Sequence, residues 1–357
     1  MKRALMGAAF AFALAAAFPA SAQNNALRIY WIDVEGGAST LFVSPSGESL
    51  LFDTGNPGNG DRDAKRIFAT AQKAGLTKID HVVISHWHGD HVGGLEALSK
   101  MIPLGKFYDH GDGVEAADKA RHDAYVAMVG ANRKILRAGD MIQLGAIPVR
   151  VVVSEGPVIA NPINGGGPNA LCANAPQMKP APPENIRMVG LSITYGSFKF
   201  ASLADLDWSR ETEMACPVNK LGRVNLYTIN RHGGLDDSGN PALLGAIQPQ
   251  VIVLNNGPRK GLGQKVADAK PINANYTPYE TNSYVRLAKN PGIEGVWAEH
   301  LSLIDKDPAH NAAPDMTANL EEGPADQGFG ISAVVGADGK FTITNARNGF
   351  SKTYQAK

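Results

Sequence analysis

The chain lacks an excess of charge of either sign. Its 357 residues hold 34 Lys and Arg against 34 Asp and Glu. Such a balance gives no general attraction to polyanions, which proteins bind through a surplus of basic side chains. The composition therefore gives no strong signal for a nucleic-acid partner. The composition still allows a local basic groove, to which Arg231, Arg259 and Lys260 could contribute.

Long hydrophobic runs are also missing, except at the start of the chain. Ala4 to Phe18 are mostly apolar, follow a Lys-Arg pair and precede the small residues Ala20-Ser21-Ala22. This order is typical of a secretory signal peptide, cleaved here near Ala22. A retained anchor is the alternative, but the run is shorter than the roughly 20 residues that a spanning helix needs. We expect a periplasmic or secreted protein with no membrane span once residues 1–22 are removed.

Cysteine is scarce, since Cys172 and Cys216 are the only two. Neither lies in a C-x-x-C pattern, so thiol chemistry is not expected. In an oxidising compartment a lone pair of cysteines is more often joined than free. We expect a Cys172–Cys216 disulfide that ties an Asn- and Pro-rich loop to the segment after Asp205, with two free thiols as the alternative.

The chain does contain a dense group of metal-binding side chains. Residues 85–94 read SHWHGDHVGG, which places four such side chains within six residues: His86, His88, Asp90 and His91. Zinc takes neutral imidazole and carboxylate as ligands, and a catalytic zinc keeps one position open for water. If residues 79–85 form a buried strand, His86 and His88 point to one side, and Asp90 and His91 open the next helix facing a second ion. A solvated His-rich turn is the alternative, which so specific a motif disfavours.

This H-x-H-x-D-H pattern resembles the motif of the metallo-β-lactamase-fold hydrolases, and the resemblance covers roughly Ile29 to Asn256. Ser49 to Asp53 looks like the first motif of that superfamily, in which the Asp orients ligands instead of binding metal. Residues 185–205 are similar to two strands that end on the metal-bridging acid, here Asp205. The resemblance implies an α/β fold, a metallo-β-lactamase-type αββα sandwich, with an additional C-terminal β-hairpin.

The resemblance also implies a set of metal ligands. Residues 224–233 are similar to the strand that ends in the closing His of the ComEC-type branch, here His232. One ion would be held by Asp90, His91, Asp205 and His232, and the other by His86, His88 and Asp205. Asp205 would bridge them. Zinc is the expected metal, as one or two ions, with manganese or iron as alternatives, and the expected catalytic carboxylates are Asp90 and Asp53.

Departures from the family pattern bear on this site. Ala204 replaces the Gly before the bridging acid, which is a mild change if φ there is negative, and Arg231 replaces one of two candidate closing histidines. The third His that the superfamily usually gives the second ion is missing from the strand at 147–153. Candidate replacements are Glu155, which follows that strand, and His300, which could instead be an ordinary buried His. Without a replacement, the second ion would be held weakly, or the site would work with one ion.

The other histidines are expected to have structural roles. We expect His81 to pack within a strand, and His110 and His122 to lie on the surface or in loops. His310 lies among Asp, Pro and Asn, so we expect it to be solvated.

The mature chain of about 335 residues is long enough for one large α/β domain. We assign residues 1–22 to the signal peptide and 23–357 to a hydrolase domain, with a core at about 28–256 and a C-terminal extension at about 257–357. Apolar residues at helical spacing predict a helix at 62–74. We also expect helices at 116–129 and 240–247, and a hairpin at 331–346 with Asp338-Gly339 at its turn. Asp207 should cap a helix that begins near Trp208, with Glu211 at the capping-box position.

Two Gly-, Pro- and Asn-rich segments, residues 156–185 and 257–275, are longer than ordinary connections. They flank the strand ends that would carry the metals. We interpret them as walls or lids of a substrate pocket, with insertions of no functional role as the alternative.

The chemistry that these features imply is hydrolysis. Zinc lowers the pKa of bound water from about 15.7 towards 7, which makes hydroxide available at neutral pH. Phosphodiesters, lactones, β-lactams and thioesters all suit such a centre, and the fold alone does not choose among them. The ComEC-like order of motifs favours a phosphodiester or related phosphate ester. The alternatives are a lactonase or β-lactamase-type hydrolase of a C–O or C–N bond, and a non-catalytic metal-binding module. Nothing in the sequence indicates an oligomeric state.

Overall fold

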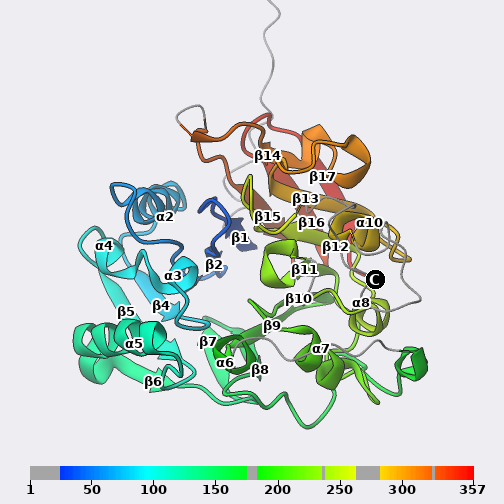
Figure 1. Ribbon diagram of the computed structural model, residues 1–357, viewed down its shortest axis with the longest axis horizontal. Coiled ribbons are helices and arrows are strands. Elements are labelled where there is room, and N and C mark those ends of the chain that lie inside the picture. Colours follow the sequence, from blue (N-terminus) through cyan, green and yellow to red (C-terminus); the bar gives the residue numbers. More distant parts are fainter. Residues whose placement is uncertain (1–24, 175–182, 235–237, 263–281, 324–325) are drawn as a thin grey trace, which may run out of the picture.

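The computed structural model describes residues 25–174, 183–234, 238–262, 282–323 and 326–357. The expected signal peptide lies outside the described residues, as do parts of both long loops. Two β-sheets pack face to face (Figure 1). One has the strand order β17-β16-β15-β1-β2-β3-β4-β5-β6 and the other β14-β13-β12-β11-β10-β9-β8-β7. Helices lie outside both sheets, so the predicted αββα sandwich is confirmed.

The first sheet is built mainly by the amino-terminal part of the chain. Its antiparallel strands are β1 (Leu27–Trp31), β2 (Thr40–Val43) and β3 (Ser49–Phe52), and its parallel strands are β4 (Ile79–Val83), β5 (Leu104–Asp109) and β6 (Arg133–Ile135). The outer face is covered by α2 (Arg62–Lys73), α4 (Leu95–Ser99) and α5 (Ala116–Val129). The predicted helix at 62–74 forms because Ala64, Ile67 and Ala71 share one buried face.

The second sheet follows in sequence. Its antiparallel strands are β7 (Met141–Leu144), β8 (Ile147–Val153), β9 (Gly190–Tyr195) and β10 (Phe198–Ser202). Parallel pairing continues from β10 through β11 (Leu226–Thr228), β12 (Val251–Leu254), β13 (Gly295–His300) and β14 (Thr317–Asn319). The accompanying helices are α6 (Pro183–Arg187), α7 (Trp208–Ala215), α8 (Pro241–Ile247) and α10 (Ser283–Ala288).

The C-terminal strands complete the first sheet. The predicted hairpin is β15 (Ile331–Val335) and β16 (Lys340–Asn345), and β17 (Ser351–Gln355) adds a third strand. β15 pairs antiparallel with β1, so residues from the two ends of the chain lie side by side. The main hydrophobic core fills the space between the sheets. There Trp31 of the first sheet donates a hydrogen bond from Nε1 to Thr228 Oγ1 of the second, at 2.8 Å.

The structure contains the predicted disulfide between Cys172 and Cys216, whose Cα atoms lie 5.6 Å apart. Disulfides persist in oxidising compartments, so this one fits an extracellular protein. A search of the described residues finds no helix that is both long and apolar enough to cross a membrane.

The helix α7 begins as predicted, but without a capping box. The Asp207 side chain accepts a hydrogen bond from Arg210 N at 3.1 Å and so caps the helix. Glu211 does not complete a capping box, and that prediction is wrong. Its buried carboxylate instead accepts hydrogen bonds from the backbone N–H groups of Gly239 and Asn240, because the chain before α8 passes over it.

Candidate metal centre

The predicted ligands meet at one end of the two sheets. Residues 86–91 follow β4, and Asp205 and His232 follow β10 and β11 of the facing sheet. Because β10 and β11 are parallel, their carboxyl ends lie at the same edge of the sheet. The chain after β4 turns at once into the short helix α3 (Gly89–Val92), which carries Asp90 and His91. Each sheet therefore contributes its own ligands.

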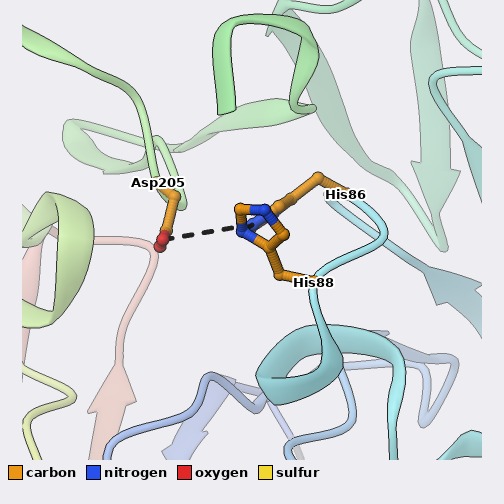
Figure 2. Close-up of side chains that lie close together, drawn as sticks. All are labelled: His86, His88 and Asp205. Carbon is orange, nitrogen blue, oxygen red and sulfur yellow. Dashed lines mark hydrogen bonds and ion pairs between the residues drawn. The ribbon is translucent and has the colours of Figure 1, made fainter. Parts of the chain in front are cut away.

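Two groups of side chains form here. In the first, ligand atoms of His86, His88 and Asp205 lie within 4.8 Å of one another, and Figure 2 shows the two imidazoles facing the carboxylate. The second group is Asp90, His91 and His232. Asp205 links the two groups, because its Oδ1 lies 3.3 Å from His91 Nε2 and 3.4 Å from His232 Nε2, and its Oδ2 lies 4.0 Å from His86 Nε2. All six predicted ligands are thus brought together.

The cluster has the polar atoms that a cation would satisfy. Among the described residues, the buried atoms His91 Nε2, His232 Nε2 and Asp205 Oδ1 have no hydrogen-bond partner. An unsatisfied buried polar group costs about 1 to 3 kcal/mol, and three converging ones need an explanation. Imidazole nitrogens and carboxylate oxygens are zinc ligands. The residues therefore fit one or two metal ions of this kind.

Burial and neighbouring charges set the protonation states of these side chains. Burial raises the pKa of Asp205, but the neighbouring His232 and His91 outweigh it and hold that pKa well below its ordinary value. The pKa of Asp90 is lowered in the same way, against its burial, mainly by His91. Burial lowers the pKa of His86 well below 6.5 and also lowers that of His232, so both imidazoles keep a lone pair at neutral pH. Coordination requires these protonation states. His91 differs, because burial lowers its pKa but the carboxylates of Asp205, Asp90 and Asp53 outweigh burial and hold that pKa well above 6.5, so a cation would have to displace that proton.

Asp53 lies behind the cluster and holds ligands in place. Its buried carboxylate accepts hydrogen bonds of 2.7 Å from His91 Nδ1, from Ser85 N and from Ser85 Oγ. His91 therefore directs Nε2 at the cluster, as a metal-binding His with a carboxylate partner does. Ser85 Oγ also lies 2.9 Å from His86 Nδ1. The role of Ser85 was not predicted from the sequence, although Ser85 is the first residue of the motif.

The backbone at the site is strained. Ala204 has φ +44°, so the condition under which its replacement of Gly would be mild is not met. Arg231 and His232 also have positive φ, at +51° and +57°. Each such residue costs roughly 1 to 2 kcal/mol, because Cβ crowds the following carbonyl oxygen. These turns are held together by a hydrogen bond from Arg231 N to Ala204 O at 3.0 Å.

The two candidate replacement ligands lie elsewhere. Glu155 forms ion pairs with Arg187 and, at 3.2 Å, with Arg137. His300 Nε2 lies 2.7 Å from Asp33 Oδ1, in a separate buried group with Glu35 and Asp326. The structure brings neither Glu155 nor His300 to the cluster. It supports the alternative interpretation of His300 as a buried, hydrogen-bonded residue.

Two predictions for other histidines are wrong. His122 lies buried within α5 and His310 is buried rather than solvated, because nearby carboxylates pair with them. His110 lies in the loop after β5 as predicted but is buried there. His110 Nε2 lies 2.8 Å from Glu184 Oε1, and His310 Nδ1 lies 2.6 Å from Asp305 Oδ2. His81 lies within β4 and contacts Tyr108 and Glu48, as expected for a packed strand residue.

Two basic side chains reach the carboxylates of the cluster. Lys260 Nζ donates a hydrogen bond to Asp90 Oδ2, and Arg231 Nη1 lies 3.7 Å from Asp205 Oδ2. Their side chains are 48% and 23% exposed, so each connects the buried cluster with the surface. Arg259 instead pairs with Glu322 at 2.6 Å. Of the three basic residues named from the sequence, Lys260 and Arg231 therefore lie beside the cluster, and Arg259 does not contact it.

Comparison with known proteins supports the family assignment. Residues 32–171 match the family model described as "Metallo-beta-lactamase superfamily". "Beta-lactamase-like protein 2 homolog" of Caenorhabditis elegans is 32% identical over 109 residues, which are 28% of this chain and 36% of that protein. "Atrochrysone carboxyl ACP thioesterase dmxR1" of Cryptosporiopsis sp. (strain 8999) is 34% identical over 76 residues, 21% of this chain and 23% of that protein. The matched segments thus span about a third or less of these relatives.

Two solved structures show a weaker similarity to this chain. The metallo-beta-lactamase fold protein YhfI from Bacillus subtilis is 15% identical, with a TM-score of 0.40, over 64% of this chain and 85% of that chain. CmlA, a diiron beta-hydroxylase from Streptomyces venezuelae, is 14% identical, with a TM-score of 0.38, over 64% of this chain and 44% of that chain. Residues 32–171 are thus similar to a metallo-beta-lactamase superfamily domain, and the two packed sheets agree with the fold expected from that similarity.

Proposed function

We propose, from the metallo-beta-lactamase superfamily domain that residues 32–171 carry, that this protein is a metal-dependent hydrolase of a phosphodiester or related phosphate ester. We further propose that it holds one or two zinc ions, that it belongs near the ComEC-like branch and that it acts outside the cytoplasm. Manganese and iron are alternative metals. The substrate would be a small molecule or an ester that reaches the cluster from the surface.

The roles of the side chains follow from their positions. His86, His88, Asp90, His91, Asp205 and His232 would hold the metal, which when bound supplies an activated water and positive charge for the leaving oxygen. Asp53 keeps His91 in one orientation through the hydrogen bond to Nδ1. The Asp90 side chain is 18% exposed against 7% for Asp205, so Asp90 is the carboxylate better able to orient the attacking water.

The preference for a phosphate ester rests on Lys260 and Arg231. Both place a cation beside a ligand carboxylate and reach the surface, which suits a substrate that carries negative charge next to its scissile bond. Charge-assisted hydrogen bonds to phosphate are about twice as strong as neutral ones. A neutral lactone would leave both cations without a role in substrate binding.

Acyl hydrolysis is the second candidate. Several relatives are named as thioesterases, and the same centre could polarise a carbonyl oxygen in a thioester, lactone or β-lactam. A non-catalytic metal-binding module is a third candidate, since the second ion lacks the family's third His.

Substrate screening of the mature protein tests these candidates. We expect turnover of bis-aryl phosphate, loss of turnover with a chelator and recovery on zinc addition. Lys260→Met should raise KM for bis-aryl phosphate more than for a neutral aryl ester, whereas the control Arg259→Met, which removes a side chain paired with Glu322, should change neither. Turnover of a lactone, β-lactam or thioester alone would replace the phosphate-ester proposal. A protein that binds no metal would end the hydrolase proposal.

Export is proposed from the apolar segment before Ala22 and is supported by the Cys172–Cys216 disulfide. Expression of the full chain in a bacterium, followed by cell fractionation and amino-terminal sequencing, should find Gln23 as the first residue of the periplasmic or secreted protein. An uncleaved chain in the cytoplasm would contradict this proposal.

A further inference from the structure

The group formed by His86, His88 and Asp205 offers three ligands to an ion, one fewer than the other group offers. The other ion would have Asp90, His91 and His232 together with the bridging Asp205. In the part of the chain that the structure describes, Glu115 and Asp118 are the only other carboxylates grouped with His88. They lie on its far side, because His88 Nε2 is 4.0 Å from Asp118 Oδ2 while Nδ1 is 3.0 Å from His86 Nε2. A further ligand on the His86 side of this group would therefore have to come from a side chain other than His, Cys, Asp or Glu.

Asn185 is a fully buried amide without a partner. Its residue exposure is 0%, and neither Nδ2 nor Oδ1 forms a hydrogen bond with any described residue. A buried amide without hydrogen bonds costs a few kcal/mol relative to an apolar side chain of similar size. Asn is therefore a poor choice for packing alone, and its burial indicates a ligand for one of the two amide atoms.

The segment that carries Asn185 is attached on both sides of His86. Glu184, the residue before it, accepts a hydrogen bond from Trp87 N at 2.9 Å. Further along, Val189 N donates one to Ser85 O at 2.8 Å. Ser85 and Trp87 are the chain neighbours of His86. The segment from Glu184 to Val189 is thus held against the metal motif on both sides of His86, with Asn185 between the two attachments.

We propose that Asn185 Oδ1 is a protein ligand of the ion held by His86, His88 and Asp205. This inference rests on the proposed metal centre and names the donor that completes its weaker half. An amide oxygen is neutral, so it adds no charge to a group that already contains the buried Asp205 carboxylate. It is also a harder donor than imidazole, which favours manganese or iron at this position more than at the other.

Metal binding measured without substrate tests the proposal. Chelated protein is titrated with Zn²⁺ by calorimetry, and bound metal is counted by mass spectrometry after dialysis. The wild type should bind two ions with unequal affinity. Asn185→Ala should weaken the looser ion by at least about tenfold, the scale seen when metal-supporting groups are removed. It should leave the tighter ion bound. Asn185→Asp, which keeps the oxygen and adds charge, should retain both ions.

Glu155→Gln is the matched control. Glu155 N donates a hydrogen bond to Arg187 O of α6, so this residue perturbs the same region, yet its carboxylate is paired with arginines. This variant should keep both affinities. Thermal unfolding of the metal-free proteins shows whether Asn185→Ala folds. If it does not, the comparison of Asn185→Asp with Asn185→Leu decides, and equal zinc binding by the two would overturn the inference.

The outcomes separate this inference from the proposed function. Two ions in the wild type and unchanged affinities in Asn185→Ala would reject Asn185 as a ligand and leave the hydrolase proposal intact. A wild type that binds no metal would reject both. Selective loss of the looser ion in Asn185→Ala, with normal binding in Glu155→Gln, supports the assignment regardless of which substrate is cleaved.

Discussion

His232 is the proposed closing ligand of the tighter half of the cluster, and the residue before it is Arg231 instead of a second His. His232→Ala should remove that ion, because Arg231 cannot coordinate a cation and His300 is hydrogen-bonded to Asp33 in a separate group. Metal content after dialysis and turnover should both fall by at least about tenfold. His300→Ala should leave metal content unchanged. The reverse result, with metal lost only from the His300 variant, would require a different set of ligands.

Ala204 illustrates a local conflict between side chain and backbone. Its φ of +44° suits Gly, so Ala204→Gly should raise the free energy of unfolding by up to about 1 kcal/mol in a urea titration of the metal-free protein. Ala201 is the control, since it lies in extended conformation within β10. There Ala201→Gly should lower stability by about 0.5 to 1 kcal/mol. Destabilisation by both changes would show that Ala204 carries no strain.

Glu299 makes stability depend on pH. It is fully buried, its two carboxylate oxygens have no hydrogen-bond partner among the described residues, and burial followed by repulsion from Asp33 raises its pKa well above 4.5. The folded state therefore keeps a proton that the unfolded chain loses. The free energy of unfolding is consequently highest below pH 4.5 and falls as the pH rises above that value. The loss is up to about 1.4 kcal/mol for each pH unit. Glu299→Gln should flatten the decline between pH 5 and 8 in denaturant titrations. Parallel curves for the two proteins would contradict this.

At this scale the sequence predicts local chemistry well and long-range pairing poorly. The six candidate ligands of the cluster could be found because each follows a strand and belongs to a short pattern. Asn185 and Ser85 carry no such signature, since their roles depend on which segment packs over the motif. His310 was expected in solvent because its neighbours are polar, yet one of the nearby carboxylates folds back to accept its hydrogen bond.

At the scale of elements, the disulfide joins two loops: the one between β8 and β9, which holds Cys172, and the one that begins after α7 with Cys216. Cys172 and Cys216 close a loop of 44 residues, and the chain-entropy model assigns about 3 to 4 kcal/mol to such a loop. The double variant with Ser at both positions should lose about that much stability. Thiol labelling of the unfolded, unreduced wild type should find no free cysteine. Two labelled thiols in protein from an oxidising compartment would refute the bridge in solution.

Helices and strands with a clear period were predictable, and their partners were not. The helix α2 matches its predicted range because apolar residues three and four positions apart are a property of that segment alone. The helix α5 also matches its predicted range. The addition of β17, the parallel pairing of β13 with β14, and the course of the chain over Glu211 depend on contacts between distant segments. Residue patterns do not encode such contacts directly.

At the scale of the molecule, the sequence predicts a core at about 28–256 and a C-terminal extension. Whether the core folds without the extension can be tested. The later residues include β13 beside β12 and β15 beside β1, so their removal would leave an open edge on each sheet. Open edges promote aggregation. We predict that a chain ending at residue 256 aggregates or unfolds without cooperativity in calorimetry, whereas the full chain unfolds in a single transition. A soluble, cooperative shortened protein would show that the core folds alone.

The division of ligands between two sheets also sets an order of events during synthesis. The segment with His86 and His91 leaves the ribosome long before Asp205 and His232 exist, and in the finished protein these later residues belong to the opposite sheet. A metal captured early would be held by an incomplete set of donors and released easily. If the cluster holds metal as proposed, its loading would come late, and a bound ion would report that both halves of the chain have met in the correct arrangement.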